Sequence, residues 1–101
     1  MNLNMLKQAQ ELKSKLDKAQ KELKNMVVEG ESGKGAVKVT INGQQKILSV
    51  KIDPSVVNPD KVKDLEKLVL KAIEEASDKS QKMAARQLKD LTGGLKIPGL
   101  T

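Results

Sequence analysis

The side chains in this sequence that could do chemistry are amines and carboxylates. Lysine and arginine together number 19 and aspartate and glutamate 13, whereas the 101 residues include no histidine, cysteine or aromatic residue. These absences exclude the usual zinc sites, thiol nucleophiles, disulfides and imidazole bases. They also exclude the aromatic stacking on which most single-strand binders rely. We therefore expect no enzyme: no catalytic residue, no metal or cofactor site and no small-molecule substrate.

The amines are concentrated in two stretches of the chain. Residues 1–26 contain six lysines and three acidic residues, a net +3, and residues 79–101 contain five basic residues and one acidic residue, a net +4. The intervening residues 27–53 and 54–78 carry +1 and −2. Clustered cations are typical of a protein that binds a polyanion, because each phosphate neutralised releases counterions. The alternative interpretation is a solvated lysine-rich face that keeps the protein soluble.

The residue types restrict how a nucleic acid could be bound. Arg86 is the single arginine, and arginine is the main reader of guanine, whereas lysine serves as a point charge for phosphate. We expect double-stranded DNA as the partner, contacted through its backbone with limited sequence preference. The candidate DNA-binding residues are Lys7, Lys13, Lys15, Lys18, Lys79, Lys82, Arg86 and Lys89.

One glycine-rich stretch, residues 30–35, superficially resembles a phosphate-binding loop. Such a loop requires a glycine where Val28 stands, and a serine or threonine after Lys34, where Gly35 stands. The motif also joins a strand to a helix, whereas this stretch is predicted to join two strands. We interpret it as a flexible inter-strand loop.

Two helices are predicted from the hydrophobic periodicity. In the first 26 residues apolar side chains recur at alternating steps of four and three, which is a heptad seam on a helix that needs a partner helix. A second helical pattern extends from Asn58-Pro59-Asp60 to about Leu91, with proline tolerated at the helix start. The residues of the first seam are Met5, Ala9, Leu12, Leu16, Ala19, Leu23 and Met26.

Between the helices the period changes to two, which is typical of strands. Two alternating apolar runs, 37–41 and 48–52, flank Asn42-Gly43, a strong signal for a two-residue hairpin turn. Residues 27–29 can add a third strand. The pairs predicted from this turn are Ile41 with Gln44 and Val37 with Leu48.

The predicted fold class is therefore α+β, with a long N-terminal helix, a three-stranded antiparallel β-meander and a long C-terminal helix. We expect a single domain over residues 1–92 and a flexible C-terminal tail over 93–101. The first helix runs into the sheet and the second runs out of it, so the two can pack antiparallel. The basic end of the second helix would then lie beside the first half of the first helix.

Composition also bears on assembly and location. With 38% hydrophobic residues and no aromatics, the core is modest, and oligomerisation is a common remedy in small scaffolds. We expect a homodimer. No stretch approaches the roughly 18 apolar residues of a membrane span, and the N-terminus lacks the basic start of a secretory signal. The expected location is cytoplasmic, without a membrane partner.

Four segments of the sequence are distinctive: Lys7-Gln8-Ala9-Gln10, residues 30–43 (GESGKGAVKVTING), Ile52-Asp53-Pro54-Ser55 and the tail at 93–100 (GGLKIPGL). Together they resemble the YbaB/EbfC family of bacterial nucleoid-associated proteins. The resemblance implies a tweezer-like homodimer with projecting helical arms, located at the nucleoid. It also implies binding of double-stranded DNA, altered DNA conformation and a role in nucleoid organisation or gene regulation. The alternative hypothesis is a scaffold whose helical arms grip another protein without direct DNA binding.

Overall fold

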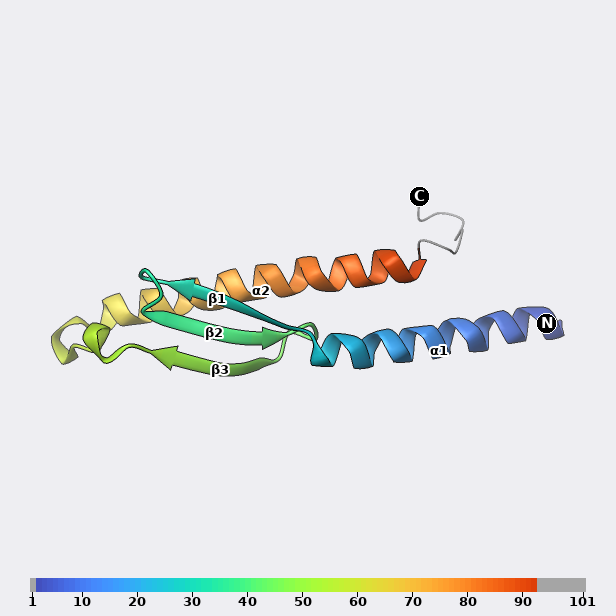
Figure 1. Cartoon of the computed structure of the whole chain (residues 1–101), viewed down its shortest axis with the longest axis horizontal. Helices are drawn as coiled ribbons and strands as arrows, with labels where there is room; N and C mark the ends of the chain where they lie inside the picture. Colours follow the sequence, from blue (N-terminus) through green and yellow to red (C-terminus); the bar gives the residue numbers. More distant parts are fainter. Residues whose placement is uncertain (1, 93–101) are drawn as a thin grey trace.

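The computed structural model describes residues 2–92 of the chain. One long helix precedes and another follows a three-stranded antiparallel sheet in the chain, and the strand order in the sheet is β1-β2-β3. This arrangement confirms the predicted α+β class. The molecule is elongated, with extents of 68 × 23 × 18 Å, and α1 and the second half of α2 extend from the same end of the sheet (Figure 1). The predicted tail, 93–101, lies outside the described residues. The elements are α1 (Leu3–Asn25), β1 (Val27–Ser32), β2 (Val37–Asn42), β3 (Ile47–Ile52) and α2 (Val62–Thr92).

Within residues 2–92, the buried residues of helix α1 lie at the end near the sheet. It begins at Asn2, whose side-chain oxygen accepts a hydrogen bond of 2.8 Å from the backbone N–H of Met5, as expected of an N-cap. Of the heptad seam, Ala19 and Leu23 are buried. Met5 and Leu16, earlier in the same seam, are exposed. The predicted apolar stripe is therefore covered in its last turns and open over the rest of the helix.

The predicted register of the β2–β3 hairpin is wrong. Val37 pairs with Ile52 rather than Leu48, and a β-bulge lets Ile41 pair with Ile47. The turn occupies more residues than predicted because Gln45, with φ 67°, takes the left-handed conformation, while the backbone N–H of Gly43 bonds to the end of α1. From Val37 to Thr40 the register differs by four residues, an even number, so Val50 and Ile52 still lie on the same face of the sheet as Val37 and Val39.

The core lies between that apolar face and α2. Val37, Val39 and Ile41 are buried against Ala72 and Ala76 of the helix. Helix α2 packs mainly over β1 and β2, so the apolar side chains of β3 stay partly open; Val50 is 45% and Ile52 39% exposed. Half of the predicted apolar face is thus covered within one chain.

Close approach of β1 to α2 depends on Gly30. A Cβ atom on this residue would lie 2.3 Å from the Ala76 backbone nitrogen and 2.4 Å from the Ala72 carbonyl oxygen. Strand and helix therefore meet backbone to backbone, and small side chains at 72 and 76 permit the contact. The rest of the glycine-rich stretch, Gly33–Gly35, turns between β1 and β2 with positive φ at all three residues, as an inter-strand loop should.

Two short 3-10 turns connect β3 to α2. The first, Pro54–Val56, is capped by Asp53, whose side chain accepts a hydrogen bond from the Ser55 backbone N–H. This bond lowers the pKa of the Asp53 carboxyl below its usual value, because it favours the charged form. The second, Pro59–Lys61, occupies the predicted helix start, and the α-helix proper begins at Val62.

Candidate nucleic-acid interface

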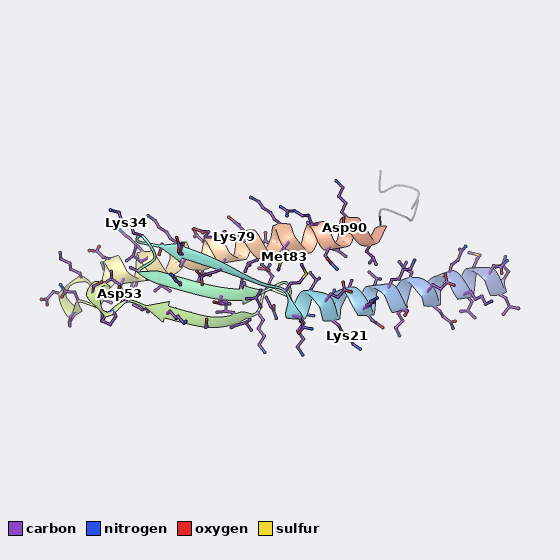
Figure 2. All side chains as sticks on the ribbon, viewed as in Figure 1. Lys21, Lys34, Asp53, Lys79, Met83 and Asp90 are labelled. Atoms are coloured by element: carbon purple, nitrogen blue, oxygen red, sulfur yellow. The ribbon has the colours of Figure 1, made fainter. Side chains whose placement is uncertain are left out.

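Four basic side chains follow one face of the second half of α2. Their spacing of three, four and three residues places them in one row along a helix. At 100° per residue, Lys82 and Lys89 project from the side nearly opposite Ser80, a fully buried residue that faces the sheet. All four are exposed, and some of the side chains on this part of α2 extend away from α1 whereas others extend toward it (Figure 2). The row consists of Lys79, Lys82, Arg86 and Lys89, all of them predicted DNA-binding residues.

Lys79 has two polar partners in the fold. Its Nζ lies 3.0 Å from a carboxylate oxygen of Glu75 and donates a 2.9 Å hydrogen bond to the carbonyl oxygen of Glu29 in β1. The hydrogen bond to Glu29 ties α2 to the edge strand β1. Lys79 therefore has a structural role in this fold, and Lys82 and Arg86 are the stronger candidates for contacting phosphate.

The predicted lysines of α1, namely Lys7, Lys13, Lys15 and Lys18, are all exposed. Lys13 and Lys18 line a shallow groove along the helix, together with Gln10, Ser14, Asp17 and Lys21. Three lysines against one aspartate make this groove basic. Lys21 was not among the predicted DNA-binding residues, although it lies three residues after Lys18, a spacing that places both side chains on the same face of a helix.

The two basic helix segments meet over a shorter length than predicted. The last turns of α2, at Gln87 and Leu91, lie beside Lys15–Glu22 in the second half of α1, rather than beside its first half. The reason is that roughly the first half of α2 lies on the sheet, so the C-terminal end of α2 does not reach the N-terminal end of α1 (Figure 1). Lys7 consequently belongs to a segment of α1 that extends beyond α2.

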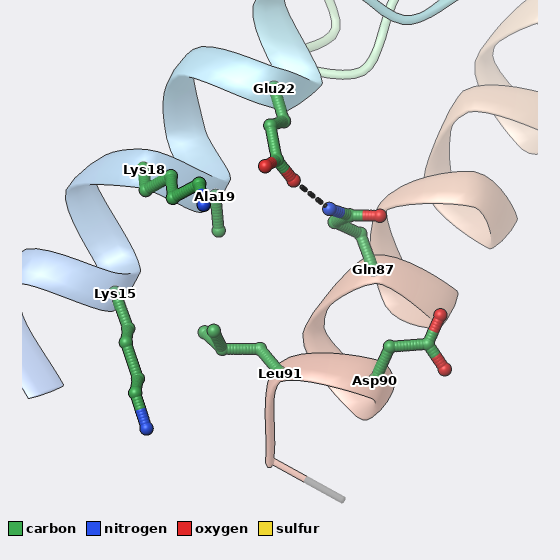
Figure 3. A pocket seen from close by; sticks show the side chains of 7 residues that line it. All are labelled: Lys15, Lys18, Ala19, Glu22, Gln87, Asp90 and Leu91. Atoms are coloured by element: carbon green, nitrogen blue, oxygen red, sulfur yellow. Dashed lines mark hydrogen bonds between the residues drawn. The ribbon is translucent and has the colours of Figure 1, made fainter.

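The cleft between the two helices is electrically mixed. It encloses about 340 Å³, and two lysines, Lys15 and Lys18, share it with the carboxylates of Glu22 and Asp90. The Gln87 side-chain amide donates a hydrogen bond to Glu22 across the cleft (Figure 3). Because the two lysines are balanced by two acids, the cleft interior does not attract an anion. The outer surfaces of the helices carry the net positive charge.

Within residues 2–92 no group of three or more acidic side chains could hold a metal ion. In the same part of the chain no helix is both long and apolar enough to cross a membrane.

Comparison with known proteins relates the chain to one family. Residues 1–95 match the sequence pattern of the YbaB/EbfC DNA-binding family. A nucleoid-associated protein of Caldanaerobacter subterraneus is 44% identical over 97 residues, covering 96% of this chain and 87% of the relative. Nucleoid-associated proteins of Clostridium acetobutylicum, 42% identical with 96% and 87% coverage, and Rhodospirillum rubrum, 43% identical with 93% and 88% coverage, are similar as well.

The fold also matches a solved structure. The crystal structure of an uncharacterized protein from Helicobacter pylori superposes with a TM-score of 0.67 at 19% identity, covering 92% of this chain and 95% of that one. In this fold one helix precedes the three-stranded antiparallel sheet in the chain and a long helix follows it.

Proposed function

Because this chain belongs to the YbaB/EbfC DNA-binding family, we propose that its basic helix faces bind the phosphate backbone of double-stranded DNA. The chain is a nucleoid-associated DNA-binding protein of that family, which is not a family of enzymes. The finer proposal is that it binds with limited sequence preference, alters the conformation of the DNA and contributes to nucleoid organisation and gene regulation.

The row on α2 is the observation that supports this proposal best. Lys82 and Arg86 are exposed on the side of the helix that is free of the sheet, with the net charge of residues 79–101 at +4, from five basic residues and one acidic residue. A regular row of cations can follow a phosphate backbone, and lysine supplies charge without reading bases. The absence of aromatic residues favours duplex DNA over single strands, which are usually held by stacking.

A salt-titrated gel shift tests the proposal. We expect the logarithm of the association constant for a duplex of mixed sequence to fall linearly with the logarithm of salt concentration, with a slope of about −0.9 per phosphate contacted. A second duplex of unrelated sequence should bind within a few-fold of the first, and a single strand of equal length should bind more weakly. Weak binding that is insensitive to salt would contradict the proposal and favour the protein scaffold.

We propose in addition that the protein is a tweezer-like homodimer joined through the open part of the sheet. A groove of about 380 Å³ between β3 and α2 is lined by Glu66 and by six apolar residues, Ile52, Val62, Leu65, Val69, Leu70 and Ile73. Strand β3 is also an edge strand, and a two-fold axis beside it would pair it antiparallel with the same strand of a second copy. Such a dimer would cover apolar surface that one chain leaves exposed, and both α1 helices would project from the joined sheets.

A lysine placed in this groove should separate the dimer. Leu70 is 56% exposed in the single chain, so Leu70→Lys leaves the chain's own core intact but brings an unpaired charge into the proposed interface, which is costly. By light scattering we expect the parent at twice the 11.0 kDa of one chain and the variant at the mass of one chain. Leu3→Lys, at the open tip of α1 and 80% exposed, is the matched control and should stay dimeric. A parent protein with the mass of one chain across dilution would contradict the homodimer.

A further inference from the structure

The β2–β3 turn, residues 42–46, holds the end of α1. The backbone N–H of Gly43 donates to the carbonyl oxygens of Leu23, at 2.8 Å, and Met26, at 2.9 Å. Both acceptors belong to the last turn or the C-cap of α1, where helix carbonyls lack partners within the helix. The side-chain amide of Gln44 adds a 2.9 Å hydrogen bond to the carbonyl oxygen of Gln20. Residues 42–46 are thus hydrogen-bonded to α1 over about two turns of the helix.

The same turn is also fastened to α2. Ser80, buried in α2, donates a 2.6 Å hydrogen bond to the carbonyl oxygen of Asn42 and accepts a 2.8 Å bond from the Gln45 side chain. Ser77 donates to the other end of that Gln45 side chain at 2.9 Å. Asn42 in turn fixes the turn itself, because its side-chain oxygen accepts from the backbone N–H groups of Gln44 and Lys46.

Among residues 2–92, few other contacts fix the direction of α1. Ala19 and Leu23 are the buried residues of this helix, and a hydrogen bond from Gln87 to Glu22 links it to α2. From Leu23 to the N-terminal end, α1 is a lever of roughly 30 Å, at 1.5 Å per residue. A small rotation at the turn is therefore amplified at the far lysines.

We propose that the β2–β3 turn is the joint that sets the angle between α1 and α2, and that it thereby controls how well the two basic helix faces engage DNA together. The second half of this statement rests on the DNA-binding function proposed above. Gly43, Gln44 and Gln45 act as positioning residues, because they carry no charge and contact the helices rather than the DNA.

Gly43 offers a direct way to move the joint. This residue is buried, and a Cβ atom on it would lie 2.7 Å from the Leu23 carbonyl oxygen and 2.9 Å from a Leu23 methyl carbon. The Leu23 carbonyl is part of the α1 backbone and cannot move without the helix. Gly43→Ala must therefore push the C-terminal end of α1 away from the turn. Gln44→Ala instead removes the bonds to Gln20 without adding any atom, which loosens α1 and leaves room at the turn.

The experiment measures the angle and the DNA affinity separately. The chain has no native cysteine, so Gln8→Cys and Ala85→Cys, both at exposed positions, accept one spin label each. Labelled chains are refolded with excess unlabelled chains so that the distance within one chain dominates the electron–electron resonance signal. Far-UV circular dichroism and light scattering check that each variant keeps the fold and mass of the parent.

We expect Gly43→Ala to shift the mean distance between the two labels by about 4 Å. Gln8 lies about 22 Å along α1 from Leu23, and a tilt of the helix by roughly ten degrees moves it by that amount. Gln44→Ala should broaden the distribution, and it decides the question if Gly43→Ala does not fold. Both should weaken duplex binding roughly tenfold at fixed salt, with a shallower salt slope because fewer phosphates are reached at once. Ser49→Ala, on the face of β3 away from α2, is the control and should change neither quantity.

Distances that are unchanged in both joint variants would overturn the proposal, whatever the DNA data show. Altered distances with parental DNA affinity would overturn the link between the joint and binding. Salt-insensitive binding by the parent protein would instead count against the DNA-binding function, and the label distances would still decide whether the turn directs α1.

Discussion

Gly30→Ala is expected to unfold most of the protein at 25 °C. The added Cβ would lie 2.3 Å from the Ala76 nitrogen, 2.4 Å from the Ala72 oxygen and 2.7 Å from the Ala76 Cα. All three atoms belong to the α2 backbone, so no side-chain rotation relieves the overlap and the helix must lift off β1. That movement opens the core beneath Val39, and we expect a loss of about 5 kcal/mol or more, which reaches the lower end of the roughly 5–15 kcal/mol by which native domains are stable.

Urea unfolding followed by circular dichroism at 222 nm measures this loss, because a chain without aromatic residues has no intrinsic fluorescence to follow. Gly35→Ala is the matched control. Gly35 has φ 86°, and a Cβ on it would meet its nearest atom at 3.6 Å, so the substitution carries only the backbone strain of about 1–2 kcal/mol. A Gly30→Ala protein with the unfolding midpoint of the parent would show that β1 and α2 are not in close contact.

The helices, the strands and their order could be predicted from the sequence because local patterns determine them. The heptad seam from Met5 to Met26 predicted α1, and alternation through Val37 and Val50 predicted strands that share an apolar face. The register of the hairpin was not accessible in the same way. Asn42-Gly43 has the residue preferences of a two-residue turn, but Gly43 is used for contact with Leu23, a residue 20 positions away in the chain. A long-range contact of this kind leaves no local signal.

The candidate interface was predictable as a charge distribution but not as a geometry. The lysines of both segments are exposed, as expected of cations, and the antiparallel course of the helices follows from the chain order. Lys79, however, donates to a carbonyl oxygen in β1, 50 residues away, so its structural role could not be read from its neighbours. Likewise, the part of α1 that lies beside the end of α2 depends on how much of α2 packs on the sheet. That length is set by tertiary packing and leaves no local signal in the sequence.

The double variant Lys82→Ala/Arg86→Ala is expected to reduce the affinity for duplex DNA by roughly 10- to 100-fold at moderate salt. If each side chain neutralises one phosphate, the log–log salt slope should become less steep by up to about 1.8. The loss should be equal for duplexes of unrelated sequence, because phosphate contacts carry no base information. Stability should change little, since both side chains are exposed and neither ties α2 to the sheet as Lys79 does. A salt-titrated gel shift gives the affinity and the slope together.

The control for this variant removes the same amount of charge from the same helix. Lys63 and Lys67 are exposed in the first half of α2, within residues 54–78, where six acidic residues outnumber four lysines. Lys63→Ala/Lys67→Ala should leave the salt slope at the parental value, because that part of the helix carries net negative charge and lies over the sheet. Equal losses in the two double variants would mean that total charge governs binding rather than the row on α2. Parental affinity in Lys82→Ala/Arg86→Ala would mean that the DNA is contacted elsewhere, with the basic groove of α1 as the next surface to test.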